Sequence, residues 1–450
     1  MLSRPEVETI VVGAGIAGLA AAWYLRDRDV LLLEASSRVG GRLLSEPRDR
    51  YWLNYGAHVF GGPGTATGHL LEEVGVVSEM IPGCLAALAM NGVLLSDGHV
   101  ETYPFRIPMP WDARLAVLRA GLKVRLAVGR YGRVSASSVG ETAEQRQQRV
   151  FEFLGDQTFA DFVGRLPEDA DAMFRPTVTR SAGTPEQVSA GAGVGYFQLV
   201  WNRSAGLSRG IVGGSSLLPE GIYAALGDKV LLGAEVHEVE LRAGGAMVRY
   251  GYAGKHEEVL ARNVVLATPA PVSRRIAVNL PTELAAALER IVYGKYVSAA
   301  FLTNETDRRP WDPCYAIATP KRRFNVMFNM TSFARAQEQK RGPGSSIMVF
   351  SPAQLADELL ELADIEIISQ YLADLDDLFG DFSGLVTEAH IRRWPLGLAY
   401  CFPGRHRLQA ALTRPLDHLQ LAGDYLGTLY SETAISSALV AAARIRRSLA

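Results

Sequence analysis

The sequence predicts an α/β protein with two domains, one built on a mostly parallel sheet and the other combining a mixed sheet with helices. Three stretches support this prediction. Residues 9–34 read as strand, glycine-rich turn, helix and strand, residues 210–270 contain a glycine pair, a helix and several strands, and residues 419–449 read as a buried strand and a final helix. Strands that alternate with helices in this way are typical of a parallel sheet covered by helices.

These three stretches are far apart in the chain, so the first domain is expected to be discontinuous. A length of 450 residues leaves room for about two or three domains and a large core. The first domain is predicted to comprise residues 1–80, 210–270 and 385–450, and the second to comprise 81–209 and 271–384.

Residues 9–34 carry the most specific motif of the chain. A short apolar strand leads into the sequence G-x-G-x-x-G, which opens a helix. Gly13 permits the tight turn, Gly15 lets a pyrophosphate approach the backbone, and Gly18 lets the helix pack against the strand. The N–H groups at the helix start, those of Ile16 and Ala17, then face the pyrophosphate.

An acidic residue completes this motif. Glu34 stands at the tip of the second strand, about 20 residues after the glycines, as in Rossmann-type dinucleotide-binding units. Its carboxylate can accept hydrogen bonds from both ribose hydroxyls and would repel a phosphate placed on one of them. The complete order of strand, glycine turn, helix, strand and acid therefore predicts dinucleotide binding.

The residues that follow this acid indicate which dinucleotide is bound. Residues 34–42 have the form E-x-x-x-R-x-G-G-R, in which two glycines allow backbone to lie against a flat ring system and an arginine can reach a phosphate. The motif resembles the second fingerprint of the FAD-dependent amine oxidase superfamily, which includes monoamine and polyamine oxidases, protoporphyrinogen oxidase and the carotenoid desaturases. The resemblance implies FAD in a Rossmann-type, GR2-like domain. The FAD contacts that it implies here are Ala35, Arg38, Gly40, Gly41 and Arg42.

The composition is that of an ordinary globular protein, with 48% hydrophobic and 21% charged residues. A formal net charge of −2 gives no reason to expect nucleic acid as a partner. The three cysteines form no C-x-x-C pair, which fits a reducing, cytoplasmic compartment, and the eight histidines lack metal-ligand spacing, so we expect no metal site. No apolar run reaches the ~18 residues of a membrane span.

Residues 54–58 resemble the stretch that passes beside the flavin in this superfamily, usually acid-x-G-A-H. Asn54 stands here in the place of the acid. The resemblance places Gly56, Ala57 and His58 next to the flavin. His58 is a weak catalytic candidate, and a structural role is the favoured interpretation.

Residues 86–148 are expected to enter the second domain. Residues 86–103 read as a hairpin that turns at Asn91-Gly92. Residues 104–133 show a basic helical pattern in which only Asp112 opposes the arginines and lysine. Such a helix can lie on an anionic membrane surface, but a solvated face of the second domain is the favoured interpretation. Residues 135–148 are polar and contain residues that favour helix, and they are predicted to be an exposed loop.

Residues 189–201 are rich in glycine and aromatic residues. Tyr196, Phe197 and Trp201 are candidates for lining a pocket, and Tyr196 is a second weak catalytic candidate. A plain aromatic core is the favoured interpretation.

Two stretches of the central chain are expected to reach the cofactor. In the superfamily, the backbone near the position of Val236 contacts the adenine. The strand predicted at 297–302 crosses near the flavin face, and in monoamine and polyamine oxidases it carries a lysine that holds a water beside the flavin. The resemblance aligns Ser298 with that lysine and turns Lys295 elsewhere, so the lysine is missing. Ser298 is the third weak catalytic candidate.

The C-terminal stretch resembles the last FAD motif of the superfamily. A buried strand ends in Gly423-Asp424, and the final helix begins close to Ser431. The resemblance implies that Gly423 and Asp424 meet the pyrophosphate and ribityl chain, and that the N–H groups of Thr433 and Ala434 face the pyrimidine edge of the flavin. A helix N-terminus stabilises negative charge by roughly 0.3 to 2 kcal/mol, which suits a reduced flavin.

Two hallmarks of the amine oxidases are missing from this region. Leu398 and Thr433 align with the two aromatic side chains that often frame the substrate nitrogen. Gly397 aligns with the cysteine that carries covalent flavin in some relatives, and Cys401 is out of register. We therefore expect FAD to be bound without a covalent bond.

The leading functional prediction is an FAD-dependent dehydrogenation of a small organic substrate, in which hydride transfer to the flavin leaves a C=N or C=C bond. One alternative is a desaturase of C–C bonds in a lipophilic substrate, as in protoporphyrinogen oxidase and carotenoid enzymes. A non-redox flavin-dependent isomerase and a binding protein like the GDP-dissociation inhibitors are further alternatives. The expected partner is a small molecule, and a homodimer stays open.

Overall fold

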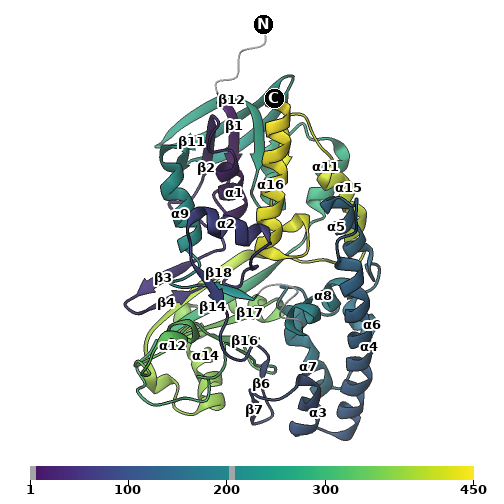
Figure 1. Cartoon of the computed structure of the whole chain (residues 1–450), viewed down its shortest axis with the longest axis vertical. Helices are drawn as coiled ribbons and strands as arrows, with labels where there is room; N and C mark the ends of the chain where they lie inside the picture. The colour runs from purple at the N-terminus through teal and green to yellow at the C-terminus, as the bar shows by residue number, and fades with distance from the viewer. Residues whose placement is uncertain (1–6, 202–207, 450) are drawn as a thin grey trace.

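The computed structural model describes residues 7–201 and 208–449. Residues 202–207, which fall in a segment predicted for the second domain, lie outside this description, as do 1–6 and 450. Two layers of structure are stacked along the long axis, each around its own sheet (Figure 1). Both ends of the chain lie at the top of the upper part.

An eight-stranded sheet forms the centre of the upper part. Strand β1 (Val7–Val12) pairs in parallel with β2 (Val30–Glu34) on one side and with β12 (Lys255–Leu266) on the other. The sheet is completed by β9 (Val230–Leu232), β10 (Glu235–Arg242), β11 (Gly245–Tyr252), β13 (Ala277–Val278) and β19 (Leu419–Leu421). Ile10 and Val11 are fully buried, because both faces of this sheet are covered.

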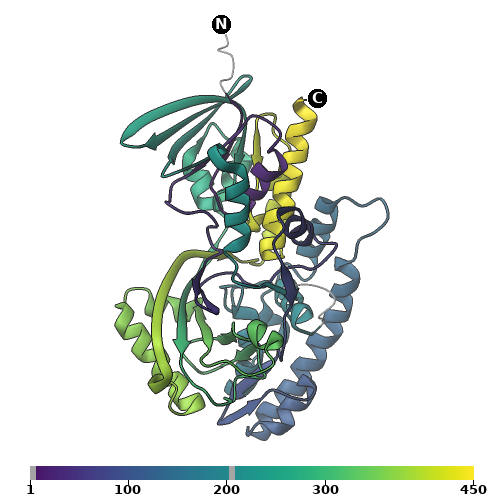
Figure 2. The same ribbon diagram turned by 60° about the vertical axis from the view of Figure 1, so that its left-hand side comes forward.

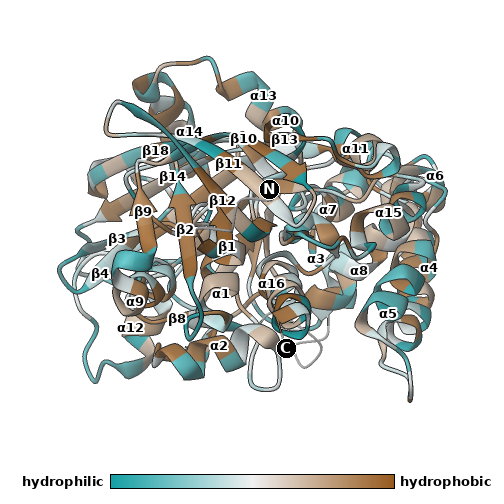
Figure 3. Cartoon of the chain, turned by 90° about the horizontal axis from the view of Figure 1, so that it is seen from above, coloured by the Kyte–Doolittle hydropathy of each residue, from teal (hydrophilic) through white to brown (hydrophobic). Residues whose placement is uncertain are grey.

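Segments from the two ends of the chain lie side by side on one face of this sheet. Helices α1 (Ile16–Tyr24) and α16 (Tyr430–Leu449) pack against each other, and Figure 3 shows them in a row with α9 (Leu217–Leu226) along brown, hydrophobic strands. Alanines on both helices are buried, which allows a close approach of the two helices. The helix α2 (Ala66–Val74) packs against α16 and α9.

A seven-stranded sheet forms the lower part. Its order is β18 (Val386–Ala399), β14 (Tyr293–Thr303), β17 (Ser346–Pro352), β16 (Val326–Asn329), β15 (Ala316–Ala318), β6 (Ala87–Met90) and β7 (Val93–Leu95). The predicted hairpin at Asn91-Gly92 is confirmed as β6–β7, with both turn residues at positive φ. Two short ribbons belong to neither sheet: β3 (Ser45–Arg48) with β4 (Tyr51–Asn54), and β5 (Ser78–Met80) with β8 (Arg209–Ile211).

Two strands pair with the sheet of the other part of the molecule, and not with that of the domain predicted for them. Strand β18 lies within 385–450 but pairs with β14 in the lower sheet, and β13 lies within 271–384 but pairs with β10 in the upper sheet. The domain limits stay a prediction, and the pairing shows that the chain crosses between the sheets at these strands.

Helices complete both parts. The lower part carries a helical layer of α3 (Tyr103–Arg106), α4 (Trp111–Ser135), α5 (Ala143–Glu152), α6 (Phe159–Val163), α7 (Glu168–Thr179) and α8 (Ala190–Trp201). Figure 2 shows the long helix α4 at the outer edge of this layer. The other helices are α10 (Ala270–Ile276), α11 (Thr282–Glu289), α12 (Ser332–Gln337), α13 (Gln354–Leu359), α14 (Asp364–Phe379) and α15 (Gln409–Thr413). Within residues 7–201 and 208–449, no helix has both the length and the apolar content needed to cross a bilayer.

The prediction of an exposed loop over 135–148 is wrong in its second half, because α5 begins at Ala143. Thr142 accepts a hydrogen bond from the backbone N–H of Gln145 (3.2 Å), whose side chain accepts one from the Thr142 N–H (2.9 Å). This reciprocal cap satisfies two N–H groups at the start of a helix whose residues are mostly polar.

Candidate cofactor and substrate site

The first glycine-rich turn has the shape that its sequence predicts. Gly13 has φ +99°, and a Cβ atom on Gly18 would lie 1.8 Å from the Gly13 carbonyl oxygen, so only glycine fits where α1 packs on the turn. A Cβ atom on Gly15 would meet no atom within 4 Å. The turn is therefore closed towards the sheet and open at Gly15, beside the start of α1 at Ile16 and Ala17.

The second glycine pair lies directly against this turn. The N–H of Gly40 donates to the Ala14 carbonyl (2.8 Å), and a Cβ atom on Gly41 would lie 3.2 Å from the Gly15 Cα. Arg38 donates to the Gly41 carbonyl (2.8 Å) and holds this loop in place. The two predicted motifs thus form one continuous backbone surface.

The carboxylate of Glu34 reaches the same surface. It accepts from the N–H of Ala14 (2.6 Å) and from that of Ser36 (2.9 Å), beside Ala35. The Glu34 carbonyl accepts from the Ala234 N–H (2.8 Å), which brings the start of β10, with Val236, next to the tip of β2. The structure therefore gathers the predicted ribose and adenine contacts at one edge of the sheet.

An ion pair links the N-terminal and C-terminal motifs. Nη1 and Nη2 of Arg42 lie 2.7 and 2.8 Å from the two carboxylate oxygens of Asp424, and Nη1 also donates to the Gly397 carbonyl (2.9 Å). The sequence predicts that Arg42 can reach a phosphate. In the structure its guanidinium group binds the carboxylate of Asp424, because a buried carboxylate requires a partner. Gly423 is tied to α16 by its N–H, which donates to Ser437 Oγ (3.0 Å).

The first turn of α16 is fixed from two sides. Glu432 accepts from the N–H groups of Ala66 (2.7 Å) and Thr67 (2.9 Å) at the start of α2, where a negative charge is stabilised. Thr433 Oγ1 accepts from the Leu429 N–H (2.9 Å), and Ala434 follows it in the buried first turn. This helix start therefore lies in a fixed orientation at the junction of the two parts.

His58 lies on the far side of the Arg42 loop. The N–H of Ala57 donates to the Arg42 carbonyl (3.0 Å), and a Cβ atom on Gly56 would lie 2.0 Å from that oxygen. His58 Nδ1 lies 2.9 Å from the Gly56 carbonyl, while its Nε2 is shielded from solvent and has no hydrogen-bond partner among the described residues. Burial lowers the pKa of His58 to about 4, so the ring is neutral near pH 7, and in the tautomer that donates from Nδ1 to the Gly56 carbonyl the Nε2 atom is an acceptor.

Ser298 lies deep in β14 and is fully engaged. Its hydroxyl donates to the Tyr55 carbonyl (2.8 Å) and accepts from Trp394 Nε1 (3.1 Å). Lys295 is exposed and pairs with Asp357 (2.7 Å), as expected for a side chain turned away from the flavin face. Ser298 therefore holds β4 and β18 together, and it is absent from the walls of the cavity described next.

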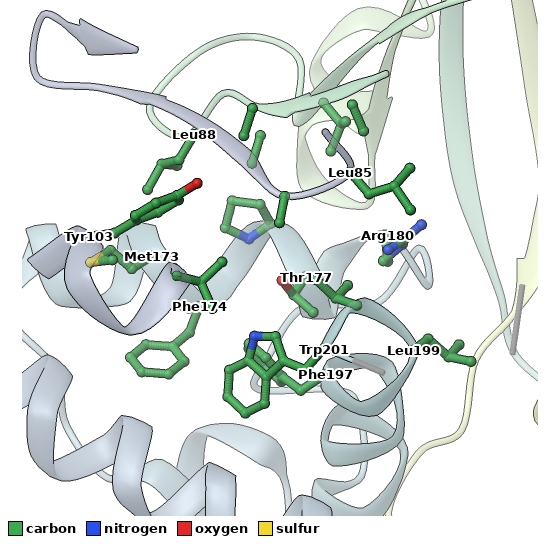
Figure 4. Close-up of a pocket in the computed structure, with 18 of the residues that line it drawn as sticks. Leu85, Leu88, Tyr103, Met173, Phe174, Thr177, Arg180, Phe197, Leu199 and Trp201 are labelled. Atoms are coloured by element: carbon green, nitrogen blue, oxygen red, sulfur yellow. The ribbon is translucent and has the colours of Figure 1, made fainter. Parts of the chain in front are cut away.

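A cavity of about 390 Å³ lies in the lower part, between the sheet and the helical layer (Figure 4). Its walls are mostly apolar and include Phe197 and Trp201, two of the three aromatic residues proposed from the sequence. The third, Tyr196, is not part of the wall: it lies behind Tyr430, stacked on it at 6.0 Å between ring centroids. An aromatic-rich helix contributes only one of its faces to a cavity. Its composition therefore cannot show which of its aromatic residues line the cavity and which pack in the core.

One end of this cavity is polar. Arg180, directly after α7, lines it together with Tyr315 and Tyr430, and Figure 4 shows Arg180 at the opposite end from Tyr103. The hydroxyls of both tyrosines are buried without a hydrogen-bond partner, and no acid within the described ranges pairs with the Arg180 guanidinium. Burial raises the pKa of both tyrosines above the usual range, so they stay protonated.

Sequence reasoning missed these three residues. Tyr430 follows the last glycine motif closely, so its position gave a usable signal. Arg180 and Tyr315 carry no motif. The polar end adjoins the motif residues, because Tyr430 opens α16 and Phe328 in the cavity wall contacts the His58 ring edge-on at 4.5 Å.

These features fit FAD. The opening at Gly15 gives room for a pyrophosphate beside a helix start, Glu34 stands at the ribose position, and Ala57 and His58 link the Arg42 carbonyl to Phe328 of the cavity wall.

Comparisons with known proteins agree with this assignment. A sequence profile described as flavin containing amine oxidoreductase matches residues 16–446. The chain is 22% identical to a 15-cis-phytoene desaturase of Narcissus pseudonarcissus, over 95% of this chain and 77% of that protein. It is 27% identical to an L-amino-acid oxidase of Demansia vestigiata, over 67% of this chain but only 58% of that protein.

The fold also matches a solved structure. Cyclohexylamine oxidase from Brevibacterium oxydans IH-35A superimposes with a TM-score of 0.77 at 19% identity, over 99% of this chain and 100% of that one. The mixed α/β architecture is therefore shared with flavin-dependent amine oxidases over the whole chain.

Proposed function

The chain belongs to the flavin-containing amine oxidoreductases and is an FAD-dependent oxidoreductase, and from this premise we propose that it dehydrogenates a largely apolar substrate that carries an anionic group. The match to a flavin-containing family leaves the alternative of a binding protein like the GDP-dissociation inhibitors without support.

In this proposal the upper part is a Rossmann-type FAD domain assembled from discontinuous segments. The turn at Gly13 and Gly15 and the start of α1 would hold the pyrophosphate, and Glu34 would hold the ribose. The start of α16, at Thr433 and Ala434, would face the flavin ring. When bound, FAD supplies a flavin that accepts a hydride from a substrate C–H bond.

The unpaired Arg180 guanidinium is the observation that carries the choice of substrate. Arg180, which is partly buried, lines the polar end of an apolar cavity, and the described residues provide no acid to neutralise it. The negative end of the α7 dipole compensates it only in part. A substrate carboxylate would complete the pairing, with Tyr315 and Tyr430 as further donors. A charged ammonium group at this end would be repelled.

The residues at three positions that are characteristic of amine oxidases favour formation of a C=C bond over a C=N bond. The positions that frame a substrate nitrogen in amine oxidases are occupied by Leu398 and Thr433, and the lysine position by the engaged Ser298. Desaturation removes a hydride from one carbon and a proton from its neighbour.

The test is anaerobic mixing of the FAD-loaded protein with three sets of probes: apolar polyene carboxylates, uncharged polyenes, and the amines putrescine and cyclohexylamine. We expect the polyene carboxylates to bleach the flavin absorbance. Arg180→Gln should weaken their binding roughly 10- to 100-fold, the effect of losing a charged hydrogen bond. Arg125→Gln, at an exposed part of the cavity wall, is the matched control and should change binding little.

Bleaching by the amines and not by the carboxylates would contradict the proposal and would favour imine formation. Conversion of substrate to an isomer while the flavin stays oxidised would favour the non-redox alternative.

A further inference from the structure

The outer face of α4 exposes a continuous row of large apolar side chains. Five of them stand between 40% and 78% exposed, at spacings of four, three, four and four residues, which places them along one side of an α-helix. They are Trp111, Leu115, Leu118, Leu122 and Leu126. The opposite side of α4 is buried against the helical layer through Ala113, Val117, Ala120, Val124, Ala127 and Tyr131. The exposed row is therefore an apolar face without a protein partner in the described chain.

Basic side chains flank this row on both sides. At about 100° per residue, one edge carries Arg119, Lys123 and Arg130 and the other carries Arg114 and Arg125, while Arg133 continues the line of the row beyond Leu126. No acid in residues 7–201 or 208–449 forms an ion pair with any of these six. Asp112 is the only acid in α4. An apolar stripe between two cationic edges is the pattern of a helix that lies in the plane of an anionic membrane surface.

We propose that α4 docks this protein on an anionic bilayer surface, with the apolar row in the outer acyl region and the basic edges at the lipid phosphates. The charges favour this occupant over a second copy of the chain. A two-fold dimer through α4 would set one cationic edge against another, with Asp112 as the only acid of each α4 to offset them. No spanning helix is needed, because an interfacial helix is held by burial of one face.

The docking face is continuous with the substrate cavity. Leu118 and Leu122 of the apolar row, and Arg125 of the basic edge, also line the cavity wall. Figures 1 and 2 show α4 along the outer edge of the lower part, away from the strands that carry the glycine motifs. A lipophilic substrate would therefore enter from the bilayer between the side chains that face it, and this last step rests on the proposed function.

Flotation of the FAD-loaded full chain with lipid vesicles tests the docking. The probes are vesicles of phosphatidylcholine alone and of phosphatidylcholine with phosphatidylglycerol in equal parts, at low and at high salt. We expect the protein to float with the anionic vesicles at low salt and much less with the neutral ones. The double variants Leu115→Glu with Leu126→Glu, and Arg119→Gln with Arg133→Gln, should each lower the apparent affinity about tenfold or more.

The control is Ile365→Glu, which also replaces an exposed apolar side chain by a carboxylate but does so on α14. It should float like the unmodified protein. None of these substituted residues lines the cavity, so all variants should keep FAD and the same flavin bleaching with detergent-dispersed substrate. Failure of the proposed reaction would leave the flotation result unchanged, so the two proposals are tested separately.

Three results would overturn the docking proposal: protein that stays unbound with anionic vesicles, flotation that the α4 variants do not reduce, or a dimer in the unmodified protein that the Leu115→Glu, Leu126→Glu variant converts to a monomer. The last result would assign the apolar row to a second copy of the chain.

Discussion

The pair between Arg42 and Asp424 joins two motifs that lie 382 residues apart. Because the Asp424 side chain is only 6% exposed, removing one partner leaves a charge that water solvates poorly. We expect Arg42→Met and Asp424→Asn each to lower the free energy of unfolding by about 3 kcal/mol. The double variant should lose clearly less than the sum of the two single losses. Denaturant unfolding of the four proteins measures this coupling, and strictly additive losses would show that the pair does not stabilise the junction.

The burial of a second residue, His58, makes the stability of the folded protein depend on pH. Its pKa is about 4 in the folded protein and near 6.5 when unfolded, so between these values the unfolded chain binds more protons and stability falls as pH falls. Relative to His58→Gln, the unmodified protein should lose on the order of 1 to 2 kcal/mol of stability between pH 7.5 and pH 5. Parallel unfolding curves at both pH values give this difference. An equal pH dependence in the two proteins would mean that the ring stays accessible to solvent.

At the scale of elements, the packing of α1 on its glycine turn depends on the missing side chain of Gly18. A methyl group there would overlap the Gly13 carbonyl oxygen, so α1 would have to shift away from the sheet. We expect Gly18→Ala to weaken FAD binding at least tenfold and to lower the thermal midpoint. Gly129→Ala, at a helical glycine of α4 with no atom near its Cβ position, is the control. It should be neutral or stabilise by up to about 1 kcal/mol. Equal behaviour of the two variants would contradict the assigned role of Gly18.

The individual helices and strands show which parts of the fold the sequence could predict. The β1, α1 and β2 elements and the final helix lie within a few residues of their predicted limits, because glycine spacing and apolar runs are local signals. Helix α5 was missed because a capping box, not apolar periodicity, marks its start. The partner of β18 was missed because strand pairing depends on chain segments that no local pattern identifies.

For the molecule as a whole, the motif residues of the cofactor site could be predicted and the substrate end could not. Gly15, Gly41 and Glu34 lie together as their motifs imply, since each motif has a fixed mechanical purpose. Arg180 and Tyr315 come from a helix end and a turn that meet only in the folded chain. No spacing rule joins such residues, so their role became visible only in the cavity.

The central claim for the whole molecule is that motifs from both ends of the chain hold one FAD. Titration of the apoprotein with FAD, followed by quenching of flavin fluorescence, tests it most directly. We expect one FAD per chain, released again by denaturation, and weaker binding in both Gly18→Ala and Asp424→Asn. Unchanged FAD affinity in Asp424→Asn, or saturation by a nicotinamide coenzyme in place of FAD, would contradict it.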